Sequence, residues 1–233
     1  LADPVQTWSS AWGDFDNDGD MDAFIGASSF TNGGHKFMRN DESTFTDVIT
    51  GTGLENFEDT DIEYVTHDFD NNGYLDIYSG SGNFFFNNGD TTFTKQIVNF
   101  GAGPIGDLNN DGAADLVISE QDGPISILIN RQPPENWIGI TLEGTTSGTD
   151  AIGSKVKVLE QSLTSSAQKI TGRSYLSYCD PRFRFVLEKT IPQVDIEVIW
   201  PTGNRELFQD RNVREYHTLR EGSGLKPEEV SNP

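Results

Sequence analysis

The sequence predicts an all-β protein made of a short repeat array followed by a second β-domain. One acidic loop occurs three times, and each copy leads into a short run of β-branched or aromatic residues bounded by turn residues. Helical periodicity is nearly absent, and the chain has 24 glycines. These observations predict three repeat units, each a four-stranded antiparallel sheet, and then a sandwich-like β-domain.

The acidic loop is the strongest functional signal. It spans 14–22, 68–76 and 107–115, with oxygen-bearing side chains at loop positions 1, 3, 5 and 9 and Gly at position 6. That spacing lets side-chain oxygens and the position-7 carbonyl converge on one hard cation, and calcium accepts such a loose shell of roughly 6–8 oxygens. We expect about three Ca²⁺ sites. The predicted ligands are Asp14, Asp16, Asp18, Asp20 and Asp22; Asp68, Asp70, Asn72, Tyr74 and Asp76; and Asp107, Asn109, Asp111, Ala113 and Asp115.

The loops do not belong to a helical calcium hand. That scaffold needs a bidentate Glu at position 12, where this chain has Ile25, Ser79 and Ile118. Asp20, Tyr74 and Ala113 occupy position 7 and are expected to contribute carbonyl oxygens, with the Asp20 side chain facing solvent. The first loop offers four carboxylates and each of the others three, so we expect it to bind calcium most tightly.

Each loop is expected to join two strands. The strand after the loop begins at Asp22, Asp76 and Asp115. A hairpin follows in the first two repeats, over 36–40 with 44–48 and over 83–87 with 92–97, and residues 125–130 correspond in the third. The loops start 54 and then 39 residues apart, which indicates an insertion at 49–60 in the first repeat.

These residues resemble the FG-GAP or VCBS-type repeats of integrin-like β-propellers. The residues that carry the resemblance are Trp12-Gly13-Asp14-Phe15-Asp16-Asn17-Asp18-Gly19-Asp20-Met21-Asp22, Met38-Arg39-Asn40 and Phe45-Thr46-Asp47-Val48. The resemblance implies calcium-binding, propeller-type blades over 1–132. A closed propeller has roughly 4–8 blades, whereas this chain has three loops.

The second half alternates apolar and polar residues, as half-buried strands do. Apolar side chains recur at every second residue in three segments, namely Ile138, Ile140 and Leu142; Val156 and Val158; and Val194, Ile196 and Val198. Together with 136–144, 150–158, 174–177 and 194–203, these segments are similar to the ASPIC/UnbV domain, which the resemblance associates with extracellular proteins such as cartilage acidic protein. We expect this domain over 133–222 and a flexible tail over 223–233.

Charge separates the two halves. Residues 1–132 carry 23 acidic and 4 basic side chains, a net charge of −19, whereas 133–233 carry 14 and 12. An acidic surface argues against nucleic acid, which needs phosphate-neutralising cations. No segment reaches the ~20 apolar residues of a membrane helix. The start at Leu1 is typical of a mature or trimmed product or of an expression boundary. Loops of this type need more calcium than resting cells supply, which favours an extracellular or cell-surface location.

No catalytic site is expected. Loop carboxylates could serve a glycosidase, but coordination accounts for every one of them. Ser174, Ser177 and Asp180 lack a nearby base, and His35, His67 and His217 lack ligand spacing. Cys179 has no assigned role, and the four Trp residues are expected to pack between sheets rather than stack on sugars.

We therefore expect a secreted structural or adhesion protein. Three repeat units without ring closure expose strand edges, which favours a homo-oligomer or polymer. A module that binds a glycan or a surface protein, cut from a longer propeller, is the alternative, and a carbohydrate-active enzyme is a distant third.

Overall fold

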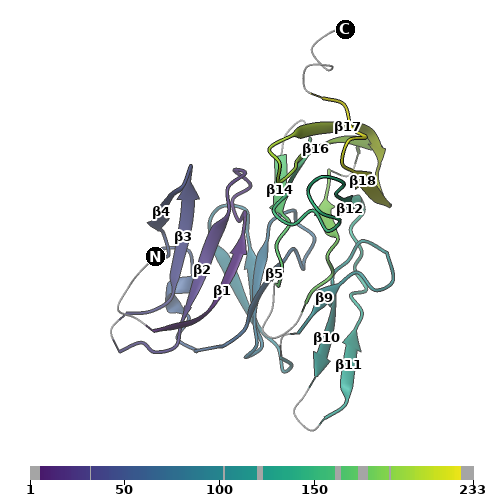
Figure 1. Ribbon diagram of the computed structural model, residues 1–233. Coiled ribbons are helices and arrows are strands. Elements are labelled where there is room, and N and C mark those ends of the chain that lie inside the picture. Colours follow the sequence, from purple (N-terminus) through teal and green to yellow (C-terminus); the bar gives the residue numbers. More distant parts are fainter. Residues whose placement is uncertain are drawn as a thin grey trace.

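The computed structural model describes residues 6–31, 33–101, 103–119, 123–160, 164–172, 178–188 and 190–226. It confirms the all-β prediction, since the described residues form strands and one single-turn 3₁₀ helix, η1 (Leu54–Asn56). Three repeat sheets follow one another along the chain, and a C-terminal unit of two further sheets lies beside them (Figure 1). Among the described residues there is no helix with the length and apolarity to cross a membrane.

The first sheet is a four-stranded antiparallel meander, as predicted. The acidic loop joins its first two strands, and positive φ angles at Glu42 and Ser43 form the tight turn between the last two. Its strands, in spatial order, are β1 (Thr7–Gly13), β2 (Asp22–Ala27), β3 (Lys36–Asp41) and β4 (Thr44–Asp47).

The second sheet repeats this arrangement. Its strands, again in spatial order, are β5 (Tyr64–His67), β6 (Asp76–Ser79), β7 (Asn83–Asn87) and β8 (Phe93–Ile97). The predicted insertion before it contains η1, and it places Leu54 and Phe57 in the core between the two sheets. The insertion is therefore a packed element of the fold.

The third sheet differs from the four-stranded prediction. It contains β9 (Ile105–Gly106), β10 (Asp115–Ser119) and β11 (Ile125–Leu128), and no described strand pairs with the outer edge of β11. The next residues include Pro133 and Pro134, which lack the N–H that a ladder needs. The chain instead continues into the C-terminal unit.

Neighbouring repeat sheets pack against each other through apolar faces. Ala11, Phe24 and Phe37 of the first sheet share a core with Ile77 and Phe85 of the second. A second core joins the second sheet to the third through Val65, Tyr78, Ile105, Leu116 and Ile118. The period-2 alternation of apolar residues along each strand thus determines which face of the sheet packs against its neighbour.

The C-terminal unit is a sandwich-like pair of sheets over one core, as predicted. One sheet has the order β15-β12-β18, with β12 and β18 parallel, and the other has β14-β13-β16-β17. Both contribute to a cluster that includes Ile140, Val156, Ile196 and the fully buried Trp200. The strands are β12 (Trp137–Glu143), β13 (Lys155–Leu159), β14 (Thr164–Gln168), β15 (Phe183–Val186), β16 (Gln193–Ile199), β17 (Arg205–Asn212) and β18 (Tyr216–Arg220).

The predicted tail begins inside this unit. Leu225 forms a β-bridge with Leu207 of β17, and the Glu206 carboxylate accepts the Gly222 and Gly224 amides. Residues 223–226 therefore lie on the C-terminal unit, and 227–233 lie outside the described residues. The predicted tail boundary at residue 222 is therefore too early, because the backbone of Gly224 and Leu225 forms hydrogen bonds with β17.

Candidate metal centres

The three acidic loops share one backbone path. Asn at position 4 has a positive φ in every copy, and Gly at position 6 does as well. In the third loop a Cβ at Gly112 would lie 2.4–2.5 Å from the Trp137 ring, so close packing adds to the conformational demand for glycine. The φ angles are 59°, 63° and 59° at Asn17, Asn71 and Asn110, and 99°, 91° and 85° at Gly19, Gly73 and Gly112.

The position-1 carboxylate organises each loop from within. One of its oxygens accepts the N–H of position 5 and the other accepts the N–H of the position-6 glycine. The first bond measures 3.0 Å for Asp14, 3.1 Å for Asp68 and 3.1 Å for Asp107. The second measures 3.0, 3.0 and 2.8 Å in the same order. Oδ1 of each of these carboxylates accepts the first of these bonds and keeps a further lone pair with which it could bind a cation.

The side chains at positions 3 and 5 are also directed by the backbone. Oδ1 of position 3 accepts the N–H of position 5, and Oδ1 of position 5 accepts the N–H of position 7. The first bond measures 3.3 Å at Asp16, 3.2 Å at Asp70 and 3.2 Å at Asn109. The second measures 2.8 Å at Asp18, 2.8 Å at Asn72 and 2.9 Å at Asp111.

The position-9 carboxylate ties the loop to its sheet. Its Oδ2 accepts the N–H of position 2, and its Oδ1 accepts the N–H of an Asn within two residues of the end of the third strand. These bonds measure 2.9 and 2.8 Å at Asp22, 2.8 and 2.8 Å at Asp76, and 2.8 and 2.9 Å at Asp115. The Asn partners are Asn40, Asn87 and Asn130.

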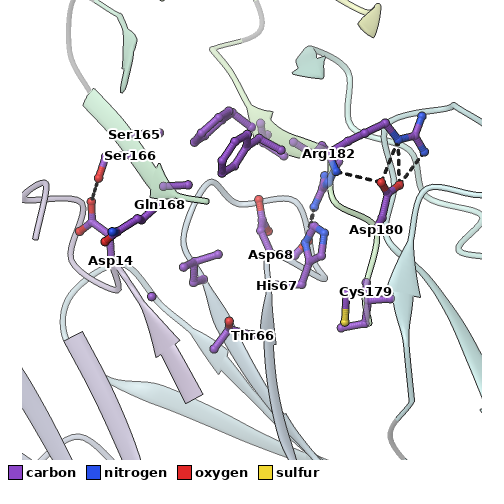
Figure 2. A pocket seen from close by; sticks show the side chains of 18 of the residues that line it. Asp14, Thr66, His67, Asp68, Ser165, Ser166, Gln168, Cys179, Asp180 and Arg182 are labelled. Carbon is purple, nitrogen blue, oxygen red and sulfur yellow. Dashed lines mark hydrogen bonds and ion pairs between the residues drawn. The ribbon is translucent and has the colours of Figure 1, made fainter. Parts of the chain in front are cut away.

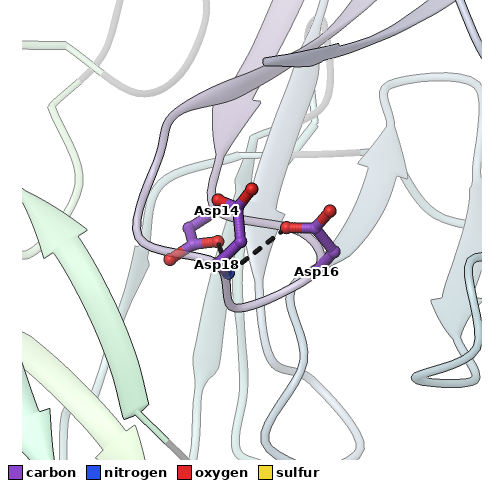
Figure 3. A group of neighbouring side chains, drawn as sticks. All are labelled: Asp14, Asp16 and Asp18. Carbon is purple, nitrogen blue, oxygen red and sulfur yellow. Dashed lines mark hydrogen bonds between the residues drawn. The ribbon is translucent and has the colours of Figure 1, made fainter. Parts of the chain in front are cut away.

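Carboxylate oxygens converge in the first two loops. Single oxygens of Asp14, Asp16 and Asp18 lie within 4.8 Å of one another, and their side chains gather inside the curl of the loop (Figure 3). Single oxygens of Asp68, Asp70 and Asp76 also lie within 4.8 Å of one another. A site made wholly of oxygen donors suits a hard cation such as Ca²⁺.

The carboxylates of the third loop do not meet that distance. Position 3 is Asn109 there, and its amide nitrogen donates to the Asp111 carboxylate at 2.8 Å. At positions 1, 3, 5 and 9 the third loop therefore has one carboxylate fewer than the first. The Asn109 amide also uses one of the Asp111 carboxylate oxygens as a hydrogen-bond acceptor.

Burial raises the pKa of the carboxyls at positions 1, 3 and 9 of the first two loops. The pKa of Asp14 rises to about 6 and that of Asp22 to about 7. In the second loop the pKa of Asp68 rises to about 6 and that of Asp76 to about 8. Desolvation is the largest cause in each case, and neighbouring carboxylates add to it. These negative charges are therefore costly unless a cation compensates them.

Asp20 occupies position 7 of the first loop, and its side chain is partly exposed, so the expectation that it faces solvent holds only in part. Its carboxylate is half-buried and accepts the Glu42 N–H at 2.9 Å, which links the first loop to the β3–β4 turn. Pairing of β3 with β2 and β4 brings that turn beside the loop. The loop sequence alone does not predict this contact. The carbonyl contributions of Asp20, Tyr74 and Ala113 to a metal site stay a prediction.

The C-terminal unit contacts the first aspartate of all three loops. The Ser166 hydroxyl donates to Asp14 Oδ2 at 2.6 Å, and the Tyr216 hydroxyl donates to Asp107 Oδ2 at 2.7 Å. Between them, Arg184 donates to the Asp68 carbonyl. Figure 2 shows the Ser166–Asp14 contact and Asp68 around one pocket, with β14 on its upper side.

Two arginines of the C-terminal unit contact the acidic loops: Arg184 bridges the second and third loops, and Arg182 contacts the third. Arg184 is half-buried and donates to the Gly112 carbonyl at 2.7 Å and to Asn71 Oδ1 at 2.8 Å, and burial lowers the pKa of its guanidinium. Arg182 donates to the Asp107 carbonyl at 2.7 Å and pairs with Asp180 at 2.6 Å. Both guanidinium groups bind oxygens outside the predicted calcium shells, so they hold the loops in place and leave the metal positions open.

Sequence reasoning assigned no role to Ser166, Arg182, Arg184 or Tyr216. A signal was present, because Arg182 and Arg184 alternate with the core residues Phe183 and Phe185. Such alternation predicts that one face of the strand meets an acidic surface, and the repeat region is that surface. The partner loop could not be named from the alternation alone.

The comparison with known families agrees with the C-terminal architecture. Residues 144–226 match the model of the family described as ASPIC and UnbV. The C-terminal unit contains an ASPIC/UnbV domain. The search of curated proteins found no match to this chain. The ASPIC/UnbV domain is therefore the part that docks on the acidic loops.

The cysteine and the four tryptophans considered from the sequence lie outside the three loops. Cys179 is a buried thiol, 9% exposed, in the core of the third sheet. Trp137 and Trp200 pack as expected, whereas Trp8 and Trp12 are 58% and 37% exposed and differ from that expectation. Ser174 and Ser177 lie outside the described residues.

Proposed function

We propose that this chain is an extracellular or cell-surface calcium-binding protein with a structural or adhesive role. In this proposal 1–132 form an FG-GAP/VCBS-type repeat array, and the ASPIC/UnbV domain locks its loops together. The array associates with other copies through its open ends. No enzymatic activity is part of the proposal.

The repeated hydrogen bonding of the three loops is the observation that carries the calcium proposal. The same six backbone-to-side-chain bonds recur in three loops whose sequences differ, and they aim oxygens into each loop. Buried Asp22 and Asp76 have raised pKa values, as expected for carboxyls that a cation would hold ionised. Solvated acidic turns would not need either feature.

Calorimetric titration of metal-free protein with Ca²⁺ tests this proposal. We expect about three sites, with the first loop tightest, and Asp14→Ala should remove the strongest site. Asp90→Ala is the matched control, because Asp90 lies in the exposed β7–β8 turn and caps only Thr92. No heat of binding, or an unchanged strongest site in Asp14→Ala, would overturn the calcium proposal.

Self-association is supported by the end of the array. The outer edge of β11 is unpaired within the described part of the chain. Ile125 and Ile127 of β11 are 72% and 60% exposed, and Ile129, which follows the strand, is 43% exposed. Exposed apolar edge strands pair with other chains unless they are covered. Light scattering of the calcium-loaded protein, run before and after chelation, tests this part, and a strict monomer at high concentration would contradict it.

Ligand binding is the second candidate. The exposed Trp8 and Trp12 lie together with Ile62 and Thr66 around one surface pocket. Exposed Trp rings can stack on sugar rings. A glycan screen with a Trp8→Ala variant distinguishes this function, because loss of glycan binding in that variant would favour it over assembly.

A further inference from the structure

Neighbouring repeat sheets are joined by the same polar contact. Asn87, at the end of β7, donates its side-chain amide to the carbonyl of Phe15 in the first loop at 2.8 Å. Asn130 donates in the same way to the carbonyl of Phe69 in the second loop at 3.3 Å. Asn87 is the last residue of β7, and Asn130 lies two residues after β11. In both cases the carbonyl belongs to position 2 of the preceding loop.

An aromatic ring completes the contact between the first two sheets. Phe93 of β8 lies opposite Asn87 in the ladder, and its ring centroid is 6.2 Å from that of Phe15 and 5.4 Å from that of Phe37. All three rings are buried. The second sheet thus contributes a donor amide and an aromatic ring to the contact. The first sheet contributes a backbone carbonyl and the two rings of Phe15 and Phe37, against which the Phe93 ring packs.

The outer face of the first sheet, turned away from the second, carries the donor half of this contact. Asn40 and Phe45 lie opposite each other, as Asn87 and Phe93 do. The Asn40 amide nitrogen donates no hydrogen bond within the described residues, although its oxygen accepts the Ser43 N–H. Phe45 and Ile25 are half-buried and Trp12 is 37% exposed. Their counterparts in the second sheet are all buried.

The outer face of the third sheet, turned away from the second, carries the acceptor half. Leu108 takes the position of Phe15 in its loop and is 50% exposed. Ile127 takes the position of Phe37, three residues before the Asn, and is 60% exposed. Leu116 and Ile118 point to the second sheet, so Ile127, which pairs with Val117 between them, points away.

We propose that the outer face of the third sheet binds the outer face of the first sheet in a second copy of this chain. Asn40 of one copy donates to the Leu108 carbonyl of the other, and the Phe45 ring packs between Leu108 and Ile127. This inference deepens the proposed function and rests on its self-association. The two faces differ, so the contact is head-to-tail and each copy keeps one open face for the next.

Calcium sets the electrostatic condition for this contact. Both faces belong to the repeat region, whose net charge is −19. Two such regions repel each other strongly at low ionic strength, and divalent ions in the loops reduce the repulsion. We therefore expect the head-to-tail contact to form in calcium and to dissociate on chelation.

Charged substitutions at the two faces provide the experiment. Phe45→Asp disables the donor face and Ile127→Asp disables the acceptor face, while Ile152→Asp adds the same charge at a residue of the C-terminal unit that is 40% exposed. Each calcium-loaded variant is measured alone and in equimolar mixture by light scattering, and its calcium stoichiometry is measured by calorimetry. All three side chains are at least partly exposed, and retained calcium binding with an unchanged melt verifies folding.

A head-to-tail contact predicts a specific pattern. Wild type and Ile152→Asp form species of several chains, and each face variant alone stays at the 25.7 kDa of one chain. Mixing Phe45→Asp with Ile127→Asp restores a species of twice that mass, because each supplies the face that the other lacks. Asn40→Ala weakens association, because the donor face loses the amide that would reach the Leu108 carbonyl.

Other patterns overturn the inference and separate it from the proposed function. If Ile127→Asp is monomeric while Phe45→Asp still associates, then β11 edges pair with each other and the head-to-tail contact is wrong, although self-association stands. If wild type remains one chain while binding calcium, both the contact and the proposed assembly fail. If mixing restores nothing, the two faces are not complementary.

Discussion

Tyr216 donates its hydroxyl to the Asp107 carboxylate at 2.7 Å, although the two residues are 109 positions apart. Asp107 is the first residue of the third loop, and the same oxygen also accepts the Gly112 N–H. Tyr216 lies over Gly139, where any Cβ would lie 2.0 Å from its ring. The ASPIC/UnbV domain thus reaches into a candidate metal loop through a tyrosine whose position depends on a glycine.

Tyr216→Phe should destabilise the protein by about 1–2 kcal/mol, because the buried Asp107 carboxylate loses one donor. Denaturant unfolding of the metal-free protein measures the change. Tyr178→Phe is the control, since Tyr178 is 53% exposed, and it should change stability little. Equal effects of the two variants would mean that the Tyr216 hydroxyl contributes nothing to docking.

Calcium should stabilise the fold by mass action. An ion that binds the native loops and not the unfolded chain adds roughly 2.7 kcal/mol per site at a hundredfold excess over its Kd. Thermal melts across a calcium series should show a midpoint that rises with the logarithm of free calcium, with Mg²⁺ at the same ionic strength as the control. A midpoint that is insensitive to chelator would show that the loops are structural turns without bound metal.

Acid should destabilise the first sheet through His35. Burial lowers the pKa of this imidazole from 6.5 to about 4, and its two nitrogens contact the Ala27 amide and the Asp59 carbonyl. A group with a lowered folded-state pKa favours the folded state when neutral, so its contribution is complete above pH 6.5 and is lost as the pH falls toward 4. The loss of stability between these pH values should be smaller in His35→Gln than in wild type. Parallel curves for the two proteins would exclude His35 as the source.

Gly26→Ala should disrupt the packing of the first sheet on the second. A Cβ there would lie 2.2 Å from Cε2 of the buried Tyr64 ring, and overpacking of this kind costs about 1–3 kcal/mol. Gly34→Ala is the matched control, because its nearest neighbour is the Phe30 ring at 3.4 Å. Denaturant midpoints measure both variants, and a neutral Gly26→Ala would mean that the sheets separate easily.

The internal structure of each loop could be predicted from sequence because it depends on neighbours within nine residues. Gly at position 6 permits the turn, and carboxylates at fixed spacing accept amides of the same loop. The strands after the loops and the hairpins were predicted for the same reason, since alternation and turn residues act locally. Metal occupancy of the loops stays a prediction.

The chain's sequence by itself determined the all-β class, the loop positions and the ASPIC/UnbV domain, since each depends on residues close together along the chain. The tertiary structure alone decided that Ser166, Arg184 and Tyr216 meet three loops more than 100 residues away. It also decided that no fourth strand pairs with β11 among the residues that the structure describes. Contacts between distant segments depend on how whole sheets pack, and sheet packing is fixed by the sum of many side-chain shapes rather than by any local pattern.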